Sequence, residues 1–233
     1  MSDKFYLTTT LPYVNSDPHI GFALEMIQAD AIVRYQQLLG KEVLFNTGTD
    51  EHGLKIYRKA EKEGMTTQEF CDKYAARFDA LKEALNLSYT HFIRTTDDYH
   101  IKAAKEFWKR CDKNGDIYKK KYKIKYCVGC ELEKTESELE DGKCPTHPNA
   151  DPEIIEEENY FFKYSRYQDE LLKLYKEHPD FVLPAHRLKE IQKFTEKGLE
   201  DFSISRLKEK MPWGIEVPGD PDHVMYVWFD ALI

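Results

Sequence analysis

The first 115 residues alternate short β-rich runs with longer segments of helical spacing. The expected strands lie at 5–10, 42–46 and 91–94. After each strand, apolar residues recur at intervals of three and four, which indicates an amphipathic helix. The expected helices lie at about 18–39, between Gly53 and Leu85 in two pieces, and at about 97–114. This alternation predicts an α/β fold, a Rossmann-like parallel sheet covered by helices.

Local signals predict where two of these helices begin. Ser16 or Asp17 is expected to cap the first helix, with Pro18 at its first helical position. Thr66 and Glu69 have the spacing of a capping box at the start of a helix that runs to about Leu85. The apolar positions with helical spacing in the first helix are Ile20, Ala23, Leu24, Ile27, Ala31 and Leu38.

The pattern changes after Gly115. A lysine-rich β-prone run at 118–126 is followed by an acidic loop, an aromatic run at 159–164 and two helical stretches at 165–178 and 184–200. Strand character returns only near His223, in the run 224–229, and residues 230–233 resemble a first helical turn. We therefore predict three parts: 1–115 as the first half of a nucleotide-binding Rossmann domain, 116–222 as an insertion, and 223–233 as the start of the second half. The run 224–229 is expected to rejoin the parallel sheet, and the chain is expected to be a fragment of a longer protein.

Composition narrows the class of protein. The chain has 233 residues, 41 % of them hydrophobic, and contains no run of eighteen apolar residues, so neither a membrane span nor a membrane partner is expected. The net charge of −8 argues against a broad nonspecific nucleic-acid surface. The five cysteines and the lack of a secretory leader are typical of a reducing, cytoplasmic location.

A pair of metal-ligand spacings occurs between residues 126 and 158. The four ligands are Cys127, Cys130, Cys144 and His147, arranged as C-x2-C, thirteen residues, C-x2-H, with Gly129 and Pro145 in the two turns. Such a set is typical of a closed, structural Zn²⁺ site. Buried cysteines without a metal are the alternative, but they do not explain why the paired spacing occurs twice.

Two turns are expected to face one crevice, because ligands of open α/β sheets bind beyond the carboxyl ends of the strands. The first strand ends at 10–15 and the second at 47–53. His19 and Gly21 lie at the start of the helix after the first turn, where free N–H groups favour phosphate. The chain contains neither a GxGxxG nor a P-loop motif, which argues against those two nucleotide-binding classes.

Three ionisable residues, Asp50, Glu51 and His52, follow one another at the end of the second strand. They are compatible with a helix-cap cluster, and equally with a pocket that binds a cationic group such as an amine.

Five motifs occur in the order found in one enzyme family. They are Leu11-Pro12-Tyr13-Val14-Asn15, Pro18-His19-Ile20-Gly21, Gly48-Thr49-Asp50-Glu51-His52-Gly53, Phe202-Ser203-Ile204-Ser205-Arg206 and Tyr226-Val227-Trp228-Phe229-Asp230-Ala231. Together with the single Cys/His knuckle, they resemble the methionyl-tRNA synthetases of the one-zinc type, which are class I enzymes. The resemblance extends from about Phe5 to the last residue.

The resemblance implies an enzyme that condenses methionine with ATP, accompanied by Mg²⁺, and transfers methionine to tRNA(Met). It implies that the insertion is the connective-peptide domain. By position in the motifs, His19 and Gly21 would bind ATP, and His19 would stabilise its phosphates. The methionine pocket would be formed by Leu11, Tyr13 and Trp228. The amino group of methionine would be bound by Asp50, with Arg206 as the ion-pair partner of that carboxylate.

Two departures from the family pattern stand out. Phe22 occupies the fourth position of the HIGH signature, where the family has a second histidine. The lysine-rich KMSKS loop and the anticodon-binding helices do not occur in the chain, so these 233 residues are expected to be inactive alone.

Two rival interpretations remain at this level. One is another class I synthetase, for leucine, isoleucine, valine or cysteine. The other is a zinc-ribbon RNA-binding module without catalysis, which the basic run Lys119-Lys120-Lys121 with Lys123 and Lys125 would favour.

Overall fold

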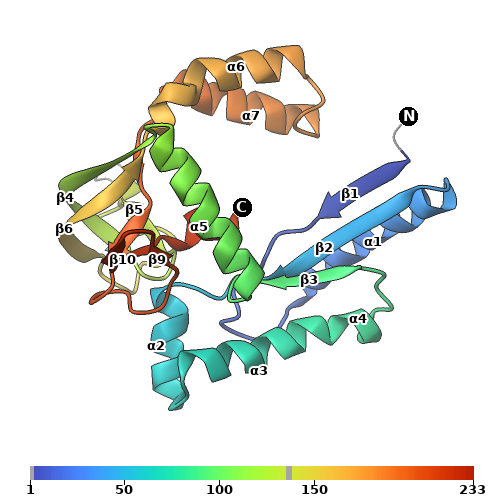
Figure 1. Cartoon of the computed structure of the whole chain (residues 1–233), viewed down its shortest axis with the longest axis horizontal. Helices are drawn as coiled ribbons and strands as arrows, with labels where there is room; N and C mark the ends of the chain where they lie inside the picture. Colours follow the sequence, from blue (N-terminus) through green and yellow to red (C-terminus); the bar gives the residue numbers. More distant parts are fainter. Residues whose placement is uncertain (1–2, 135–137) are drawn as a thin grey trace.

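A parallel sheet forms the first part of the molecule. The computed structural model describes residues 3–134 and 138–233. The strands β1 (Lys4–Thr8), β2 (Glu42–Thr49) and β3 (His91–Arg94) lie side by side in this order, and both pairings are parallel. The helices α1 (Ile20–Leu38) and α3 (Thr67–Asp79) both contact β2, so the central strand is covered (Figure 1). The predicted α/β class is confirmed.

Within the described residues the structure gives the helices α1 (Ile20–Leu38), α2 (Leu54–Glu63), α3 (Thr67–Asp79), α4 (Leu81–Ala84), α5 (Asp98–Lys113), the 3-10 turn η2 (Tyr164–Tyr167), α6 (Gln168–Glu177), α7 (Ala185–Glu196) and α8 (Val227–Ala231). No helix in the described ranges combines the length and the apolar character needed to cross a membrane.

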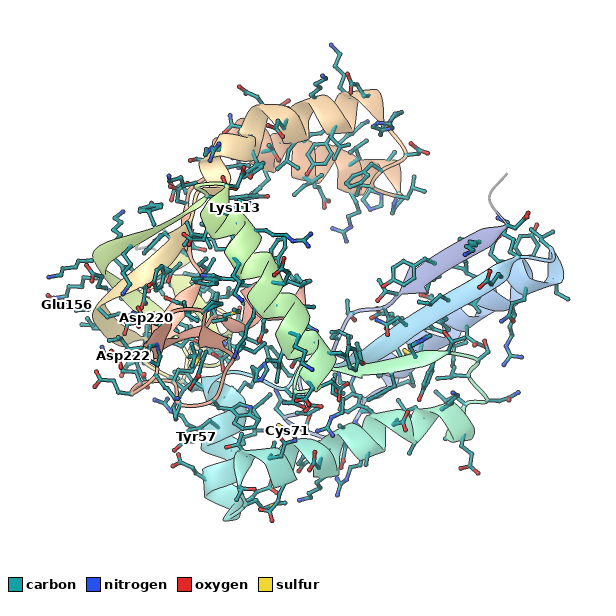
Figure 2. All side chains as sticks on the ribbon, viewed as in Figure 1. Tyr57, Cys71, Lys113, Glu156, Asp220 and Asp222 are labelled. Atoms are coloured by element: carbon teal, nitrogen blue, oxygen red, sulfur yellow. The ribbon has the colours of Figure 1, made fainter. Side chains whose placement is uncertain are left out.

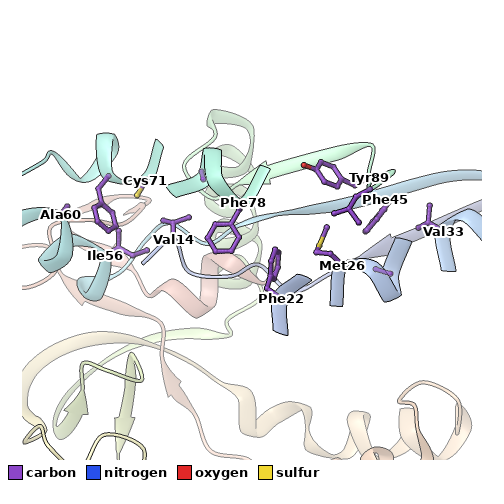
Figure 3. Packing of buried hydrophobic residues seen from close by; sticks show 14 residues of the cluster. Val14, Phe22, Met26, Val33, Phe45, Ile56, Ala60, Cys71, Phe78 and Tyr89 are labelled. Atoms are coloured by element: carbon purple, nitrogen blue, oxygen red, sulfur yellow. The ribbon is translucent and has the colours of Figure 1, made fainter. Parts of the chain in front are cut away.

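Helix α1 buries a different face from the one expected. Phe22 and Met26 are buried, whereas Ile20 is 89 % and Leu38 is 85 % exposed. Phe22 packs edge-on against Phe78 of α3, with the ring centroids 5.2 Å apart, and lies in the core between sheet and helices (Figure 3). Helical spacing alone could not choose between two apolar faces of α1, because both sets of residues repeat every three or four positions.

The start of α1 was also predicted wrongly. His19, and neither Ser16 nor Asp17, is the N-cap, because its imidazole accepts the backbone N–H groups of Gly21 and Phe22. Histidine is not among the usual capping residues, so the capping rules favoured the hydroxyl and carboxylate upstream.

The helix that begins after Thr66 is shorter than predicted. The capping box between Thr66 and Glu69 is confirmed, with both reciprocal hydrogen bonds present. The helix does not run unbroken to Leu85, however. Ala80 separates α3 from the short α4.

An antiparallel sheet follows α5. It contains β5 (Leu132–Lys134), β4 (Ile117–Cys127), β6 (Glu153–Phe162) and β7 (Phe202–Ser203), in this order. The helices α6 and α7 pack against each other and project from this lobe (Figure 1).

A second small sheet corrects the prediction for the end of the chain. The strand β10 (Asp220–Met225) pairs antiparallel with β8 (Ser205–Leu207) and β9 (Glu216–Val217), and not with the parallel sheet. The expected strand 224–229 is therefore wrong beyond Met225, and α8 begins at Val227. An apolar run of this length is compatible with either a strand or a buried helix, and only packing decides between them. Strand structure also returns earlier than expected, with β7 and β8.

A second hydrophobic core joins the two parts. Trp108 of α5 contacts Phe229 of α8 and Tyr160 of β6 edge-on, at centroid distances of 5.3 Å each. Ile204 and Met225 are fully buried in the same cluster. Helix α5 therefore connects the parallel sheet to the inserted lobe. The boundaries predicted for the three parts stay a prediction.

Candidate active site and metal centre

The four predicted metal ligands converge in the inserted lobe. Their ligand atoms all lie within 4.8 Å of one another. The Cys130 and Cys144 sulfurs are 3.5 Å apart, and Nδ1 of His147 lies 3.2 Å from the Cys130 sulfur and 3.6 Å from that of Cys127. Metal–sulfur bonds of about 2.3 Å in a tetrahedral site place two sulfurs about 3.8 Å apart and a sulfur and a nitrogen about 3.5 Å apart. The cluster can therefore hold a metal ion, and its dimensions fit zinc.

Gly129 makes the first turn of this centre possible. A Cβ at residue 129 would lie 2.5 Å from the ring of His147, a distance at which real Cβ atoms essentially never occur. The histidine ring can thus pack directly on the C-x-G-C turn only because this residue has no side chain.

A cavity of about 520 Å³ lies at the carboxyl ends of the parallel strands. Leu11, Tyr13, Asp50 and Trp228, the four residues predicted to bind methionine, all line it, together with His100. The two turns meet there through the backbone: the N–H of Asp50 donates to the carbonyl of Pro12 at 2.9 Å. The ring of Trp228, from α8, lies edge-on to the ring of Tyr13, with the two ring centroids 6.3 Å apart. Residues 215 positions apart in the chain thus share one apolar wall.

Asp50 is the acidic group of this cavity. Its side chain is 3 % exposed, and among the described residues no partner donates a hydrogen bond to its Oδ1. Burial raises the pKa of Asp50 well above its ordinary value, the carboxylates of Asp230 and Glu131 raise it further, and a hydrogen bond from the His52 backbone opposes them. A bound cation would remove this penalty, because an opposite charge at close range favours the ionised carboxylate.

The residues next to Asp50 hold the loop in place. The buried carboxylate of Glu51 accepts two hydrogen bonds from the guanidinium of Arg94, at 2.6 and 2.8 Å, and one each from Thr49 and Thr96 at 2.6 Å. Nδ1 of His52 lies 2.7 Å from Asp230 of α8. The helix-cap interpretation of Asp50, Glu51 and His52 does not hold, since Gly53 is the N-cap of α2 and each of the three side chains faces a different element.

Arg206 is a buried residue of β8, and its side chain is not the surface cation that its sequence context would suggest. It is 3 % exposed and donates to the Ser203 hydroxyl at 2.8 Å and to the Ser205 carbonyl at 2.7 Å. Its guanidinium carbon lies 4.2 Å from the centroid of the Tyr226 ring, in cation–π range. The direct ion pair between Asp50 and Arg206 stays a prediction.

His19 lies at the N-terminus of α1, as the nucleotide hypothesis requires. Its Nδ1 accepts from the N–H of Gly21 at 3.1 Å and of Phe22 at 3.3 Å. In a neutral imidazole the other nitrogen, Nε2, then carries the proton and can donate. A Cβ at Gly21 would lie 3.1 Å from the His19 ring, so glycine here makes room for the imidazole itself. Phe22, which stands where the family has a second histidine, is a buried core residue.

The sequence interpretation missed several polar residues near the site. His100 lines the cavity with an unpartnered Nε2 among the described groups, and burial lowers its pKa more than the nearby Asp230 carboxylate raises it. Asp230 and Glu131 bring further buried carboxylates toward Asp50. His52 and Asp230 belong to two of the family motifs, but nothing in the sequence indicates that their side chains are in contact. Glu131 was visible only as the residue after Cys130.

Comparison with known proteins agrees with this geometry. The family model described as "tRNA synthetases class I (M)" matches residues 5–151 and 134–233. The chain therefore belongs to the class I tRNA synthetases. The methionine–tRNA ligase of Nostoc sp. is 50 % identical over 230 residues, and that of Thermotoga maritima is 49 % identical over 234 residues. The chain belongs to the methionyl-tRNA synthetase family and corresponds to its catalytic region.

The chain spans less than half the length of these relatives: 98 % of it aligns with 43 % of the Nostoc protein, and 99 % with 37 % of the Thermotoga protein. A solved structure of Mycobacterium tuberculosis methionyl-tRNA synthetase in complex with methionyl-adenylate superposes on the whole chain, which corresponds to 46 % of that chain, with a TM-score of 0.93 and 42 % identity. The free form of the same enzyme superposes with a TM-score of 0.80 and 38 % identity, over the whole of this chain and 44 % of that enzyme's chain.

Proposed function

We propose that this chain is the methionine- and ATP-binding part of an enzyme that forms methionyl-adenylate and transfers methionine to tRNA(Met). The single observation that carries the proposal is the cavity in which the apolar walls of Leu11, Tyr13 and Trp228 adjoin the buried, incompletely bonded carboxylate of Asp50. An amino acid with an unbranched thioether side chain matches both halves, because aromatic surfaces favour sulfur and the carboxylate favours an ammonium group.

The reaction needs positioning and charge stabilisation more than covalent chemistry. A carboxylate oxygen of methionine attacks the α-phosphorus of ATP, a P–O bond forms, and pyrophosphate leaves with the electrons of the bond that breaks. His19 is proposed to donate from Nε2 to phosphate oxygens in that transition state. Gly21 is proposed to bind ATP at the same end of α1, where the positive end of the helix dipole favours the anion, although its own N–H already donates to His19. Mg²⁺ accompanies ATP as its counter-ion.

Zn²⁺ is the proposed occupant of the Cys127, Cys130, Cys144 and His147 site. With four protein ligands it has no open coordination position, so its contribution is the folding of its own loop. The proposed location is the cytoplasm, where thiols stay reduced.

The alternative of an RNA-binding zinc ribbon loses its main support. The lysine-rich strand β4 pairs along its length with the acidic strand β6, so that Lys121 faces Glu158 and Lys123 faces Glu156. The Lys123 and Glu156 side chains lie 3.6 Å apart. Facing carboxylates cancel the local positive potential that a phosphate backbone requires.

Titration calorimetry of the purified chain with methionine tests the proposal, with leucine and cysteine as controls. Of these three amino acids, we expect only methionine to bind. Asp50→Asn should weaken binding about 30-fold or more, because truncating one partner of a buried charge pair costs about 2–5 kcal/mol. Arg206→Lys should weaken it almost as much as Arg206→Ala, since lysine keeps the charge and loses the planar fork. Equal binding of leucine or cysteine would contradict the assignment of the substrate, and unchanged affinity in Arg206→Lys would reject the role of the fork.

A further inference from the structure

Glu131 is a buried acidic residue of the metal loop that no metal ligation explains. It follows Cys130 directly, and its side chain is 1 % exposed. Its backbone has a φ of 53°, in the left-handed region that non-glycine residues seldom adopt. Positions of this kind persist only where surrounding contacts determine them.

One carboxylate oxygen of Glu131 caps helix α2 from outside that helix. The N–H of Lys55 donates to its Oε1 at 2.5 Å. The N-cap residue of α2 is Gly53, which has no side chain with which to accept a first-turn N–H. A residue 76 positions away along the chain supplies that acceptor, and the Lys55 ammonium in turn donates to the carbonyl of Gly129 at 3.2 Å.

The other carboxylate oxygen and the backbone carbonyl of Glu131 bind the two tyrosines beside Arg206. Its Oε2 accepts the Tyr126 hydroxyl, and its backbone carbonyl accepts the Tyr226 hydroxyl. The Arg206 guanidinium carbon lies 5.5 Å from the Tyr126 ring centroid and 4.2 Å from that of Tyr226. Glu131 thus orients both aromatic rings against which Arg206 packs.

The approach to α2 depends on Gly53. This residue has a φ of 110°, and a Cβ added there would lie 3.2 Å from Oε1 of Glu131. Gly53 closes the loop that starts at Asp50, so the carboxylate contacts the loop at its end and at the helix that follows.

We propose that Glu131 is a positioning residue for the methionine site, through which the geometry of the metal centre fixes both the Asp50–Gly53 loop and the two tyrosines beside Arg206. The proposal rests on the proposed function in one respect, that the ligand held by these residues is methionine. Its structural half, the coupling of the metal centre to the start of α2, can be tested without any substrate.

The experiment compares Glu131→Ala and Glu131→Gln with the unaltered chain. Glutamine keeps an acceptor oxygen for the Lys55 N–H, whereas alanine removes it. Glu156→Ala is the matched control, because Glu156 lies on β6 of the same lobe (Figure 2) with a side chain that is 75 % exposed. The readouts are metal content, hydrogen exchange at the Lys55 amide, and methionine affinity by calorimetry.

We expect alanine to retain the metal, to speed Lys55 exchange about tenfold, and to weaken methionine binding about tenfold, the scale of losing a helix cap. Glutamine should stay within about threefold in both readouts, and Glu156→Ala should match the unaltered chain. Unchanged methionine affinity in the alanine variant, or equal losses with glutamine and alanine, would overturn the proposal.

A second arm tests the coupling to the metal. Chelation of the unaltered chain should speed Lys55 exchange, and the same treatment of Glu131→Ala should add nothing further. Equal acceleration in both proteins would overturn the coupling. If the unaltered chain does not bind methionine at all, the proposed function fails, while the exchange measurements still decide the role of Glu131.

Discussion

Glu51→Gln is expected to destabilise the protein strongly, because the carboxylate is the centre of a buried network. Glu51 has no exposed surface, and its two oxygens accept from the Arg94 fork and from the hydroxyls of Thr49 and Thr96. Glutamine has nearly the same shape, but one of its two groups is an NH₂ that can only donate. That group would face donors already present, and the guanidinium would keep only the Asp72 carboxylate, 2.6 Å away, as its counter-charge.

The magnitude follows from the burial of the pair. Breaking a buried, hydrogen-bonded ion pair by altering one partner costs about 3–5 kcal/mol. For a domain of about 150–250 residues, each kcal/mol lowers Tm by about 2–4 °C. The expected decrease in Tm is therefore about 6–20 °C. The Arg94 side chain is 24 % exposed, so residual hydration of the guanidinium places the effect toward the lower end of this range.

Thermal unfolding by circular dichroism at neutral pH measures this effect, and Glu63→Gln serves as the control. Glu63 also pairs with a cation, Lys73 at 2.8 Å, but the two side chains are 37 % and 36 % exposed. Exposed pairs contribute about 0–1 kcal/mol, so this Tm should change by less than about 4 °C. Equal small changes in both variants would refute the reasoning that burial of the Glu51 network sets its contribution.

Three further outcomes are expected. Gly129→Ala should lower the zinc content, measured by mass spectrometry, well below one per chain, because the added methyl would overlap the His147 ring; a full complement would contradict the steric argument. Burial raises the pKa of Asp220, but hydrogen bonds from Lys119 and Tyr160, together with the His223 imidazole 3.1 Å away, outweigh it and hold the pKa well below its ordinary value. The ionised Asp220 therefore stabilises the folded protein above about pH 4, and this contribution is lost as pH falls toward the folded pKa. In urea unfolding, Asp220→Asn should lower the free energy of unfolding more at pH 7 than at pH 3. The control Asp222→Asn, at an exposed residue (Figure 2), should lower it equally at both pH values. In ATP–pyrophosphate exchange, the 233-residue chain alone should run at least about a hundredfold below a full-length relative, because it lacks the lysine-rich loop that would meet the leaving pyrophosphate; comparable rates would contradict this.

Local information in the sequence was enough for the class of fold and for the metal centre. The alternation of β-rich and helical segments predicted the parallel sheet of β1, β2 and β3, and the capping box at Thr66 predicted the start of α3. The doubled Cys/His spacing identified all four residues of the cluster. The strands and helices themselves, the capping box and the ligand spacing depend on residues close in the chain, so periodicity and spacing record them directly.

Long-range packing decided the rest. Helix α1 has two apolar faces, and the partners that bury Phe22 rather than Ile20 lie far along the chain. The run 224–229 is apolar enough for a strand, but β8 pairs only with Val224 and Met225 and β9 only with Val224. Helix α8 then brings Trp228 against Tyr13.

The polar network of the site had the weakest signal in the sequence. His52 meets Asp230 across 178 positions, and Glu131 caps α2 across 76. Hydrogen bonds between such distant residues leave no period or spacing to read, because they depend on how the inserted lobe packs against the parallel sheet. The sequence alone therefore determined the four residues of the metal cluster and predicted the candidate residues of the cavity, and only the tertiary structure determined which buried groups surround them.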